Sequence, residues 1–242
     1  MGTIGTTRAE TGHPVGQIFG YVHDRLFTED DFKDVENGVL KDGVPKQTFT
    51  AKVRPGDIKY VDLDKNGFID TYDQMAIGGT ENPEIVYGFG VNLRWKELDF
   101  GAMFQGIGRT WRILSSNIMP ASNKGSMYNI FDNYQDRWTV DNQSQDVFYP
   151  RADYGPNANN SQKSTWWLRN MSFLRLKNLE LGYSCPKKWL QGFVISNARV
   201  FVRGTNLLTF SKFNLWDPEL ATGDGAKYPA MKSVSVGFDI TF

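Results

Sequence analysis

Two neighbouring segments in the middle of the chain alternate regularly between apolar residues and small or polar ones. Residues 85–95 carry apolar side chains at every second position: Ile85, Tyr87, Phe89, Val91, Leu93 and Trp95. Residues 98–104 repeat this alternation, and the polar pair Lys96-Glu97 separates the two segments. A period of two residues is typical of a β-strand that buries one face. The pattern therefore predicts an antiparallel hairpin with one apolar face.

The same alternation returns in the last third of the chain, in residues 166–184, 198–203 and 233–242. Within the first of these segments the phase of the apolar residues changes around Lys177–Asn178. Such a slip indicates either a β-bulge or the point where a strand leaves a bilayer. The last segment ends on Phe242, inside the predicted strand.

The length of these strands bears on the fold class. Ordinary strands run about five or six residues, whereas a strand that crosses a bilayer in a β-barrel needs about nine to eleven, apolar on one side. A large soluble sheet with one solvated face remains the alternative. We predict an all-β protein, made of antiparallel strands of a transmembrane β-barrel (a partial barrel) with long extracellular loops.

Residues 110–165 lack this periodicity and are rich in Asn, Ser, Gln and Asp, with scattered aromatic residues. A segment of this length is normal for the outer loops of membrane barrels and unusual inside a compact soluble domain. We expect residues 1–83 to form an extracellular loop and strand region, and residues 84–242 to form the barrel strands with this outer loop. Trp111 and Trp138 are candidate contacts for a substrate or a partner, and the alternative is that they pack the loop itself.

Composition narrows the function classes. The chain has 27 Lys and Arg against 27 Asp and Glu, so no net field attracts polyanions. A single cysteine, Cys185, excludes an internal disulfide. With His13 and His23 as the only histidines, there is little material for a zinc site. No apolar run is long enough for a transmembrane helix. No nucleophile motif is present, and we expect no catalysis.

Residues 62–73, Asp-Leu-Asp-Lys-Asn-Gly-Phe-Ile-Asp-Thr-Tyr-Asp, match the spacing of a calcium-binding loop. Gly67 stands where such a loop turns sharply, and Ile69 would hold the loop against an apolar surface. The expected ligands are the side chains of Asp62, Asp64, Asn66, Asp70 and Asp73 and the carbonyl of Phe68. Asp73 replaces the usual Glu, and its shorter side chain predicts weaker or water-mediated binding. A solvated acidic turn is the alternative. The flanks do not predict the paired helices of a helix–loop–helix hand, so we interpret the loop as an insertion in a β-rich chain.

Several short motifs occur in an order that resembles one known family. They include Pro55-Gly56-Asp57-Ile58-Lys59-Tyr60 before the acidic loop, Tyr87-Gly88-Phe89, Phe104-Gln105-Gly106, Asp136-Arg137-Trp138-Thr139, Phe173-Leu174-Arg175-Leu176-Lys177-Asn178, Leu181-Gly182-Tyr183, Asn206-Leu207-Leu208-Thr209-Phe210 and Asp217-Pro218-Glu219. Together with the terminal aromatic strand, they resemble the C-terminal portion of SusC/RagA-type, TonB-linked outer membrane transporters of Bacteroidetes.

The resemblance implies a location in the outer membrane and a barrel of about 22 strands closed by an N-terminal plug. It implies TonB-driven import of oligosaccharides or peptides, with a SusD-like surface lipoprotein as lid, and a role for Phe242 in recognition by the assembly machinery. About five or six strands cannot close such a barrel, since even small barrels use eight. We therefore expect a piece of a longer transporter, with TonB contacted through a plug outside this chain. The alternative function is a soluble, calcium-dependent surface module that binds a glycan or a protein.

Overall fold

The structure is a computed structural model, which describes residues 2–4, 7–115, 131–153, 157–192 and 194–242. The chain divides into two compact units. The loop unit comprises Met1–Glu81, Trp111–Arg169 and Thr222–Asp224, and the sheet unit comprises Asn82–Thr110, Asn170–Ala221 and Gly225–Phe242. Of the helices in the described ranges, none has both the length and the apolar character needed to cross a membrane.

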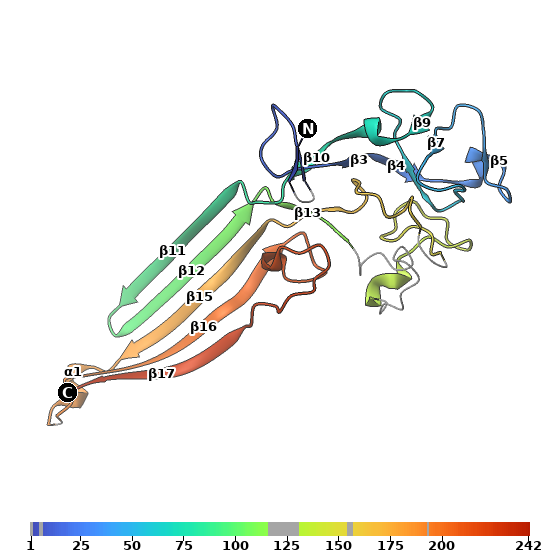
Figure 1. Ribbon diagram of the computed structural model, residues 1–242. Coiled ribbons are helices and arrows are strands. Elements are labelled where there is room, and N and C mark those ends of the chain that lie inside the picture. The colour runs from blue at the N-terminus through green and yellow to red at the C-terminus, as the bar shows by residue number, and fades with distance from the viewer. Residues whose placement is uncertain (1, 5–6, 116–130, 154–156, 193) are drawn as a thin grey trace. The chain divides into compact units, whose positions relative to one another are not determined.

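The sheet unit is an antiparallel sheet of five strands in the order β11-β12-β15-β16-β17 (Figure 1). The strands are β11 (Ile85–Trp95), β12 (Leu98–Gly108), β15 (Phe173–Ser184), β16 (Asn197–Ser211) and β17 (Ser233–Thr241). The short helix α1 (Lys187–Leu190) and the 3₁₀ helix η5 (Pro218–Leu220) lie in the connections. Trp95 pairs with Leu98 across Lys96-Glu97, which confirms the predicted hairpin.

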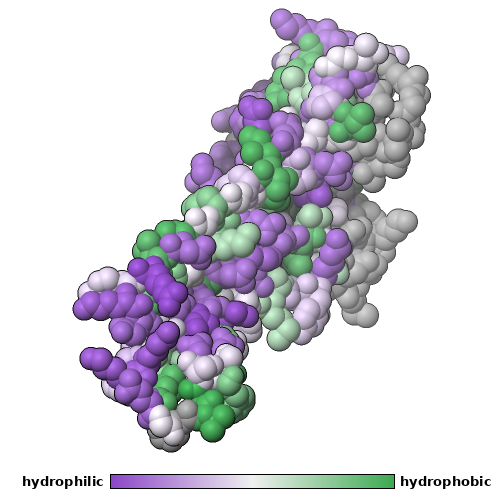
Figure 2. Space-filling view, turned by 90° about the vertical axis from the view of Figure 1, so that its left-hand side faces the viewer, coloured by the Kyte–Doolittle hydropathy of each residue, from purple (hydrophilic) through white to green (hydrophobic). Residues whose placement is uncertain are grey.

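Strand register places the apolar residues of all five strands on one face. One row across the sheet runs through Leu93, Phe100, Leu181, Val202 and Val236, each paired with the next. Directly paired residues lie on the same face of a sheet. Many large side chains of this apolar face are 36% (Tyr183) to 70% (Phe238) exposed, whereas Leu176 beside the bulge is 7% exposed. Hydrophobic patches also reach the surface among hydrophilic residues in the side view of Figure 2. The sheet therefore presents an apolar face that the described residues leave largely uncovered.

The opposite face is mainly polar or glycine, although Met103 and Phe201 also lie on it. The neighbouring row runs through Asn92, Gly101, Glu180, Arg203 and Ser235. A division into an apolar face and a mainly polar face is what the wall of a membrane barrel requires, because one face meets hydrocarbon and the other meets the lumen.

The register shifts once in the middle of the sheet. Met103 pairs with Asn178 and the adjacent Phe104 pairs with Leu176, so Lys177 is an extra residue in β15. β16 has a matching irregularity, because Leu176 pairs with Leu208 and Asn178 with Thr205. This confirms the bulge predicted at Lys177–Asn178. The extra residue keeps Leu176 and Leu179 on the same apolar face although they are three positions apart.

The loop unit consists of short, mostly paired strands. They are β1 (Gly2–Ile4), β2 (Thr7–Ala9), β3 (Gln17–Tyr21), β4 (His23–Leu26), β5 (Phe32–Asp34), β6 (Val39–Leu40), β7 (Lys46–Gln47), β8 (Ile58–Tyr60), β9 (Phe68–Ile69), β10 (Gln74–Thr80), β13 (Trp111–Ile113) and β14 (Leu168–Asn170), with the 3₁₀ helices η1 (Glu29–Asp31), η2 (Thr71–Asp73) and η4 (Asp132–Gln135). The pairs are β1-β2, β3-β10, β4-β8, β5-β6, β7-β9 and β13-β14, with β7-β9 parallel.

Aromatic side chains form much of the core of the loop unit. Tyr21, Phe49 and Tyr60 contact one another with ring centroids 4.9 to 5.9 Å apart. Tyr149 and Trp167, both at most 2% exposed, pack together at 6.3 Å. Short strands provide few ladder hydrogen bonds, so the burial of large aromatic surfaces contributes much of the stabilisation here.

The expected domains 1–83 and 84–242 stay a prediction about which parts lie outside the membrane; in the two compact units, the described parts of 111–165 group with residues 1–81. Residues 116–130 and 154–156 of the expected outer loop lie outside the described residues.

Candidate functional sites

The acidic loop folds around its own backbone amides. Asp62 accepts a hydrogen bond from Gly67 N at 2.8 Å, and Asp64 accepts one from Asn66 N at 3.1 Å. Asp73 is fully buried and accepts from Leu63 N at 2.7 Å and from Asp70 N at 2.8 Å. Gly67 has φ +86°, the left-handed conformation predicted for the sharp turn. The carboxylates are therefore held by the backbone in fixed directions.

Three carboxylates of this loop converge. Among the described residues, Asp62, Asp64 and Asp73 offer ligand oxygens that all lie within 4.8 Å of one another. Asp70 is not part of this group, and its Oδ1 accepts from Tyr72 N as the N-cap of η2. Asn66 Oδ1 accepts from Phe68 N at 2.7 Å.

One oxygen of this group has no partner among the described residues. There, Asp62 Oδ1 is buried and accepts no hydrogen bond, whereas Oδ2 of the same carboxylate accepts from Gly67 N. A buried acceptor without a donor is costly, and carboxylates at this separation repel one another. A hard cation with oxygen ligands relieves both effects. The residues present therefore fit a divalent cation.

The loop is fixed to the core beside it. Ile69 is fully buried and belongs to β9, which pairs with β7. Thr48 reinforces this pairing, because its Oγ1 donates to Ile69 O at 2.6 Å. The expected apolar anchor of the loop is confirmed.

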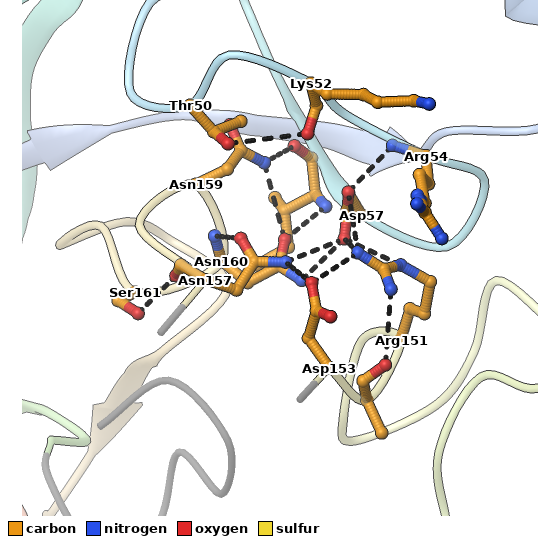
Figure 3. Close-up of polar contacts among 12 residues, drawn as sticks. Thr50, Lys52, Arg54, Asp57, Arg151, Asp153, Asn157, Asn159, Asn160 and Ser161 are labelled. Carbon is orange, nitrogen blue, oxygen red and sulfur yellow. Dashed lines mark hydrogen bonds and ion pairs between the residues drawn. The ribbon is translucent and has the colours of Figure 1, made fainter. Parts of the chain in front are cut away.

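A second polar cluster of the loop unit centres on Asp57, which is 1% exposed (Figure 3). Asp57 Oδ1 accepts from Asn157 Nδ2 at 3.0 Å, from Asn160 Nδ2 at 2.9 Å and from Arg151 Nε at 3.2 Å. Its Oδ2 accepts from Arg54 N at 2.8 Å and from Arg151 Nη2 at 3.3 Å.

The asparagines of this cluster also bond the backbone of β8. Asn160 Oδ1 accepts from Ile58 N at 2.9 Å, and Asn159 Nδ2 donates to Ile58 O at 2.7 Å. Partners about 100 residues apart in sequence are thereby joined, a role that the sequence analysis missed. The sequence shows Asp57 in a Pro-Gly-Asp turn and a group of asparagines at 157, 159 and 160. No local pattern in either segment indicates that the two bind each other.

The two candidate tryptophans are less exposed than their polar neighbours in the sequence suggest. Trp138 is 5% exposed and packs against Gly56, where an added Cβ would lie 2.4 Å from its ring. Trp111 is half-buried in β13 and packs over Gly78. These placements favour the packing alternative for much of their ring surfaces.

The polar face of the sheet unit carries an ion-pair network. Arg199 of β16 contacts Asp99 of β12, Glu180 of β15 at 2.7 Å and Asp239 of β17 at 3.3 Å. Arg203 contacts Glu180 at 2.6 Å. The alternation in 198–203 predicts the shared face of the two arginines. Their acidic partners become apparent only when the register of the neighbouring strands is known.

Comparisons with known proteins agree with this architecture. No protein-family model matches the chain. The chain is 32% identical, over 202 residues, to TonB-dependent receptor P26 of Formosa agariphila, and the match covers 77% of this chain and 20% of that protein. It is 24% identical, over 205 residues, to TonB-dependent receptor SusC of Bacteroides thetaiotaomicron, covering 82% of this chain and 19% of SusC. The chain thus spans about a fifth of the length of these relatives.

Solved structures give the same result. The structure of the RagAB peptide importer in the open-open state matches with a TM-score of 0.64 and 25% identity, and covers 93% of this chain and 22% of that chain. The closed-closed state matches with a TM-score of 0.64 and 27% identity. These relatives are named as receptors and an importer rather than as enzymes.

The two-faced antiparallel sheet, with strands of bilayer-crossing length, defines the class as a β-barrel protein of the outer membrane. Within that class, the chain belongs to the SusC/RagA family of TonB-dependent receptors.

Proposed function

We propose that this chain forms a section of wall and an outer region of a TonB-dependent transporter that imports oligosaccharides or peptides, and that it performs no catalysis of its own. The observation that carries the proposal is the sheet unit. Its apolar row from Leu93 to Val236 suits hydrocarbon, and its polar row from Asn92 to Ser235 suits an aqueous lumen.

The partners follow from the family. A SusD-like surface lipoprotein serves as the lid, and TonB acts through a plug formed by other parts of the transporter. The loop unit, with the described parts of residues 111–165, lies on the extracellular side. Trp111 and Trp138 are the candidate contacts to substrate or lid within it, in each case through the ring surface that is not packed against glycine.

The test compares uptake in three strains: one with the intact gene that encodes this chain, one with the gene deleted, and one that lacks TonB. Radiolabelled peptides and oligosaccharides serve as cargo. We expect uptake of one cargo class in the first strain alone, with the protein in the outer membrane fraction. Equal uptake in all three strains would refute the proposal. A protein recovered in the soluble fraction that binds glycan or protein only with calcium would instead support the surface-module alternative.

For the acidic loop, we propose that Asp62, Asp64, Asn66, Asp70 and Asp73, with the Phe68 carbonyl, hold one Ca²⁺ by oxygens at about 2.3–2.6 Å. The unpartnered Asp62 Oδ1 supports this proposal. Asp70 must turn from its capping position to take part, directly or through water.

The test of this site measures calcium binding by the complete transporter in detergent. We expect Asp62→Ala with Asp64→Ala to abolish one bound calcium and to speed proteolysis of the loop, while the strands stay folded. Asp132→Ala with Asp141→Ala, a pair of exposed acids elsewhere in the loop unit, is the control. Equal calcium stoichiometry in all three proteins would rule the site out.

A further inference from the structure

A cavity of about 450 Å³ lies within the loop unit and has an unusual balance of charge. Three of its lining residues are arginines, Arg54, Arg137 and Arg151, and one, Glu29, is acidic. Val35, Pro55 and Val140 supply apolar surface. Arg54, Glu29 and Val140 are exposed, so the cavity is open to solvent.

The three arginines differ in their partners. Arg151 forms ion pairs with Asp57 at 3.1 Å and with Asp153 at 2.8 Å. Arg137 donates to Tyr134 O at 3.0 Å, and its guanidinium lies 4.7 Å from the Tyr134 ring centroid. These contacts orient Arg137 without neutralising it. Within the described part of the chain, neither Arg137 nor Arg54 has an ion-pair partner. Two positive charges at this cavity are therefore not held in an ion pair by any described residue.

Trp138 also lines the cavity, but its indole N–H is not open to it. Within the described residues, the Trp138 Nε1 is buried and has no hydrogen-bond partner. Trp138 is itself 5% exposed, so a ligand reaches this atom poorly. The charged groups open to a ligand are thus the guanidinium groups of Arg54 and Arg137, beside the carboxylate of Glu29.

We propose that this cavity binds a carboxylate of a peptide, with Arg54 and Arg137 as its ionic partners and with Val35, Pro55 and Val140 against a neighbouring apolar side chain. This assignment builds on the proposed transport function, because it names a chemical group of the cargo. An ionised carboxylate is an acceptor-only group that matches the fork of donors on a guanidinium. The apolar wall provides the contact that a free inorganic anion would not use.

The cavity suits a sugar less well. Sugar hydroxyls both donate and accept hydrogen bonds, and sugar rings stack on exposed aromatic faces. Here the guanidinium groups of Arg54 and Arg137 can only donate, and the aromatic residue that lines the cavity is largely buried against Gly56.

The test measures peptide binding by calorimetry with the complete transporter purified in detergent. One probe is a short amidated peptide that contains Leu-Glu, and a second contains Leu-Gln in its place. A third has Leu as its last residue with a free terminal carboxylate. An oligouronate of the same charge is the fourth. The pocket variants are Arg54→Gln with Arg137→Gln and, separately, Glu29→Gln. Lys33→Gln with Lys41→Gln is the control, since it removes two charges from exposed positions of the same unit that do not line the cavity.

We expect the Leu-Glu peptide, the free-carboxylate peptide or both to bind, and the Leu-Gln peptide to bind at least tenfold more weakly. The arginine double variant should lose about tenfold or more in affinity. Glu29→Gln should increase the affinity severalfold, because it removes a charge that repels the carboxylate. A purely structural role of these residues would not produce such an increase. The lysine control should change less than twofold.

Three results would overturn the proposal: equal losses in the arginine and lysine variants, no loss in either, or tighter binding of the oligouronate through the same arginines. Wild-type binding with no uptake of any cargo in cells would instead count against the transport function and leave the pocket assignment standing. Uptake in cells, together with peptide binding that the arginine substitutions do not change, would refute the pocket assignment and leave the transport function standing.

Discussion

Replacing the buried carboxylate of Asp57 should destabilise the loop unit far more than replacing a surface carboxylate of similar geometry. In the native protein, each carboxylate oxygen of Asp57 accepts from at least two donors. In Asp57→Asn, an amide NH₂ replaces one of these oxygens. The amide cannot accept from these donors, and Arg151, 16% exposed, keeps only Asp153 as an acidic partner.

The expected cost follows from burial. Removing one partner of a buried, hydrogen-bonded ion pair costs about 3–5 kcal/mol. The control is Asp42→Asn, which breaks the 2.7 Å pair between Lys33 and Asp42 with side chains 50% and 94% exposed. Such an exposed pair contributes about 0–1 kcal/mol. The comparison therefore separates the effect of burial from the effect of distance.

Hydrogen exchange of the complete transporter in detergent measures this difference at β8 and residues 157–167. If these amides exchange through opening of the loop unit, Asp57→Asn should lower their protection by about two to nearly four orders of magnitude. Asp42→Asn should lower it by less than about one. Equal protection in the two variants would refute the view that Asp57 joins the two segments.

Three further predictions test other parts of the chain. Asp31 is 4% exposed; burial raises its pKa, but bonds from Arg25, Thr28 and Lys59 outweigh this and lower it to about 2. Its stabilisation, up to about 2 kcal/mol, should be complete above pH 4 and lost as pH falls towards 2, a dependence that Asp31→Asn should remove from acid-unfolding curves. Leu179→Arg should destabilise the folded barrel in the membrane by about 2–4 kcal/mol and so reduce its assembly, whereas Asn178→Arg on the polar face should assemble normally. Heat-modifiable gel mobility measures the assembled fraction. Trp111→Ala should weaken substrate or lid binding at a normal surface level, and unchanged uptake would assign Trp111 to packing alone.

The sequence predicts the sheet unit well because its information is local. Alternation defines 85–95 and 98–104 directly, and the phase slip at Lys177 locates the bulge. A period of two is sufficient, since each residue is assigned by its immediate neighbours to one of two faces. The acidic loop is equally local, because twelve consecutive residues contain its proposed ligands.

The loop unit is predicted poorly for the opposite reason. Its strands are two to seven residues long and carry little periodic signal. Its fixed contacts, such as Asp57 with Asn160, join segments about 100 residues apart. Trp138 lies in a polar stretch that is compatible with a substrate or lid contact and with packing, and Gly56 gives its ring a place to pack. Such complementarity is a property of two distant segments together and is absent from either alone.

The extra residue in β15 gives the wall one position where a shorter strand would keep both of its faces. Above the bulge, Arg175 lies on the polar face, where it is 1% exposed and bonds Asp217 and Glu219 near η5. Loss of Lys177 alone would leave Leu174, Leu176 and Leu179 at every second position, so each would keep its face and Arg175 would stay on the polar face. Loss of one residue elsewhere in the strand, with the bulge kept, would exchange the two faces at one end and bring polar groups such as the Arg175 guanidinium into hydrocarbon. During evolution, this strand should therefore accept the loss of a single codon at the bulge more readily than elsewhere along its length.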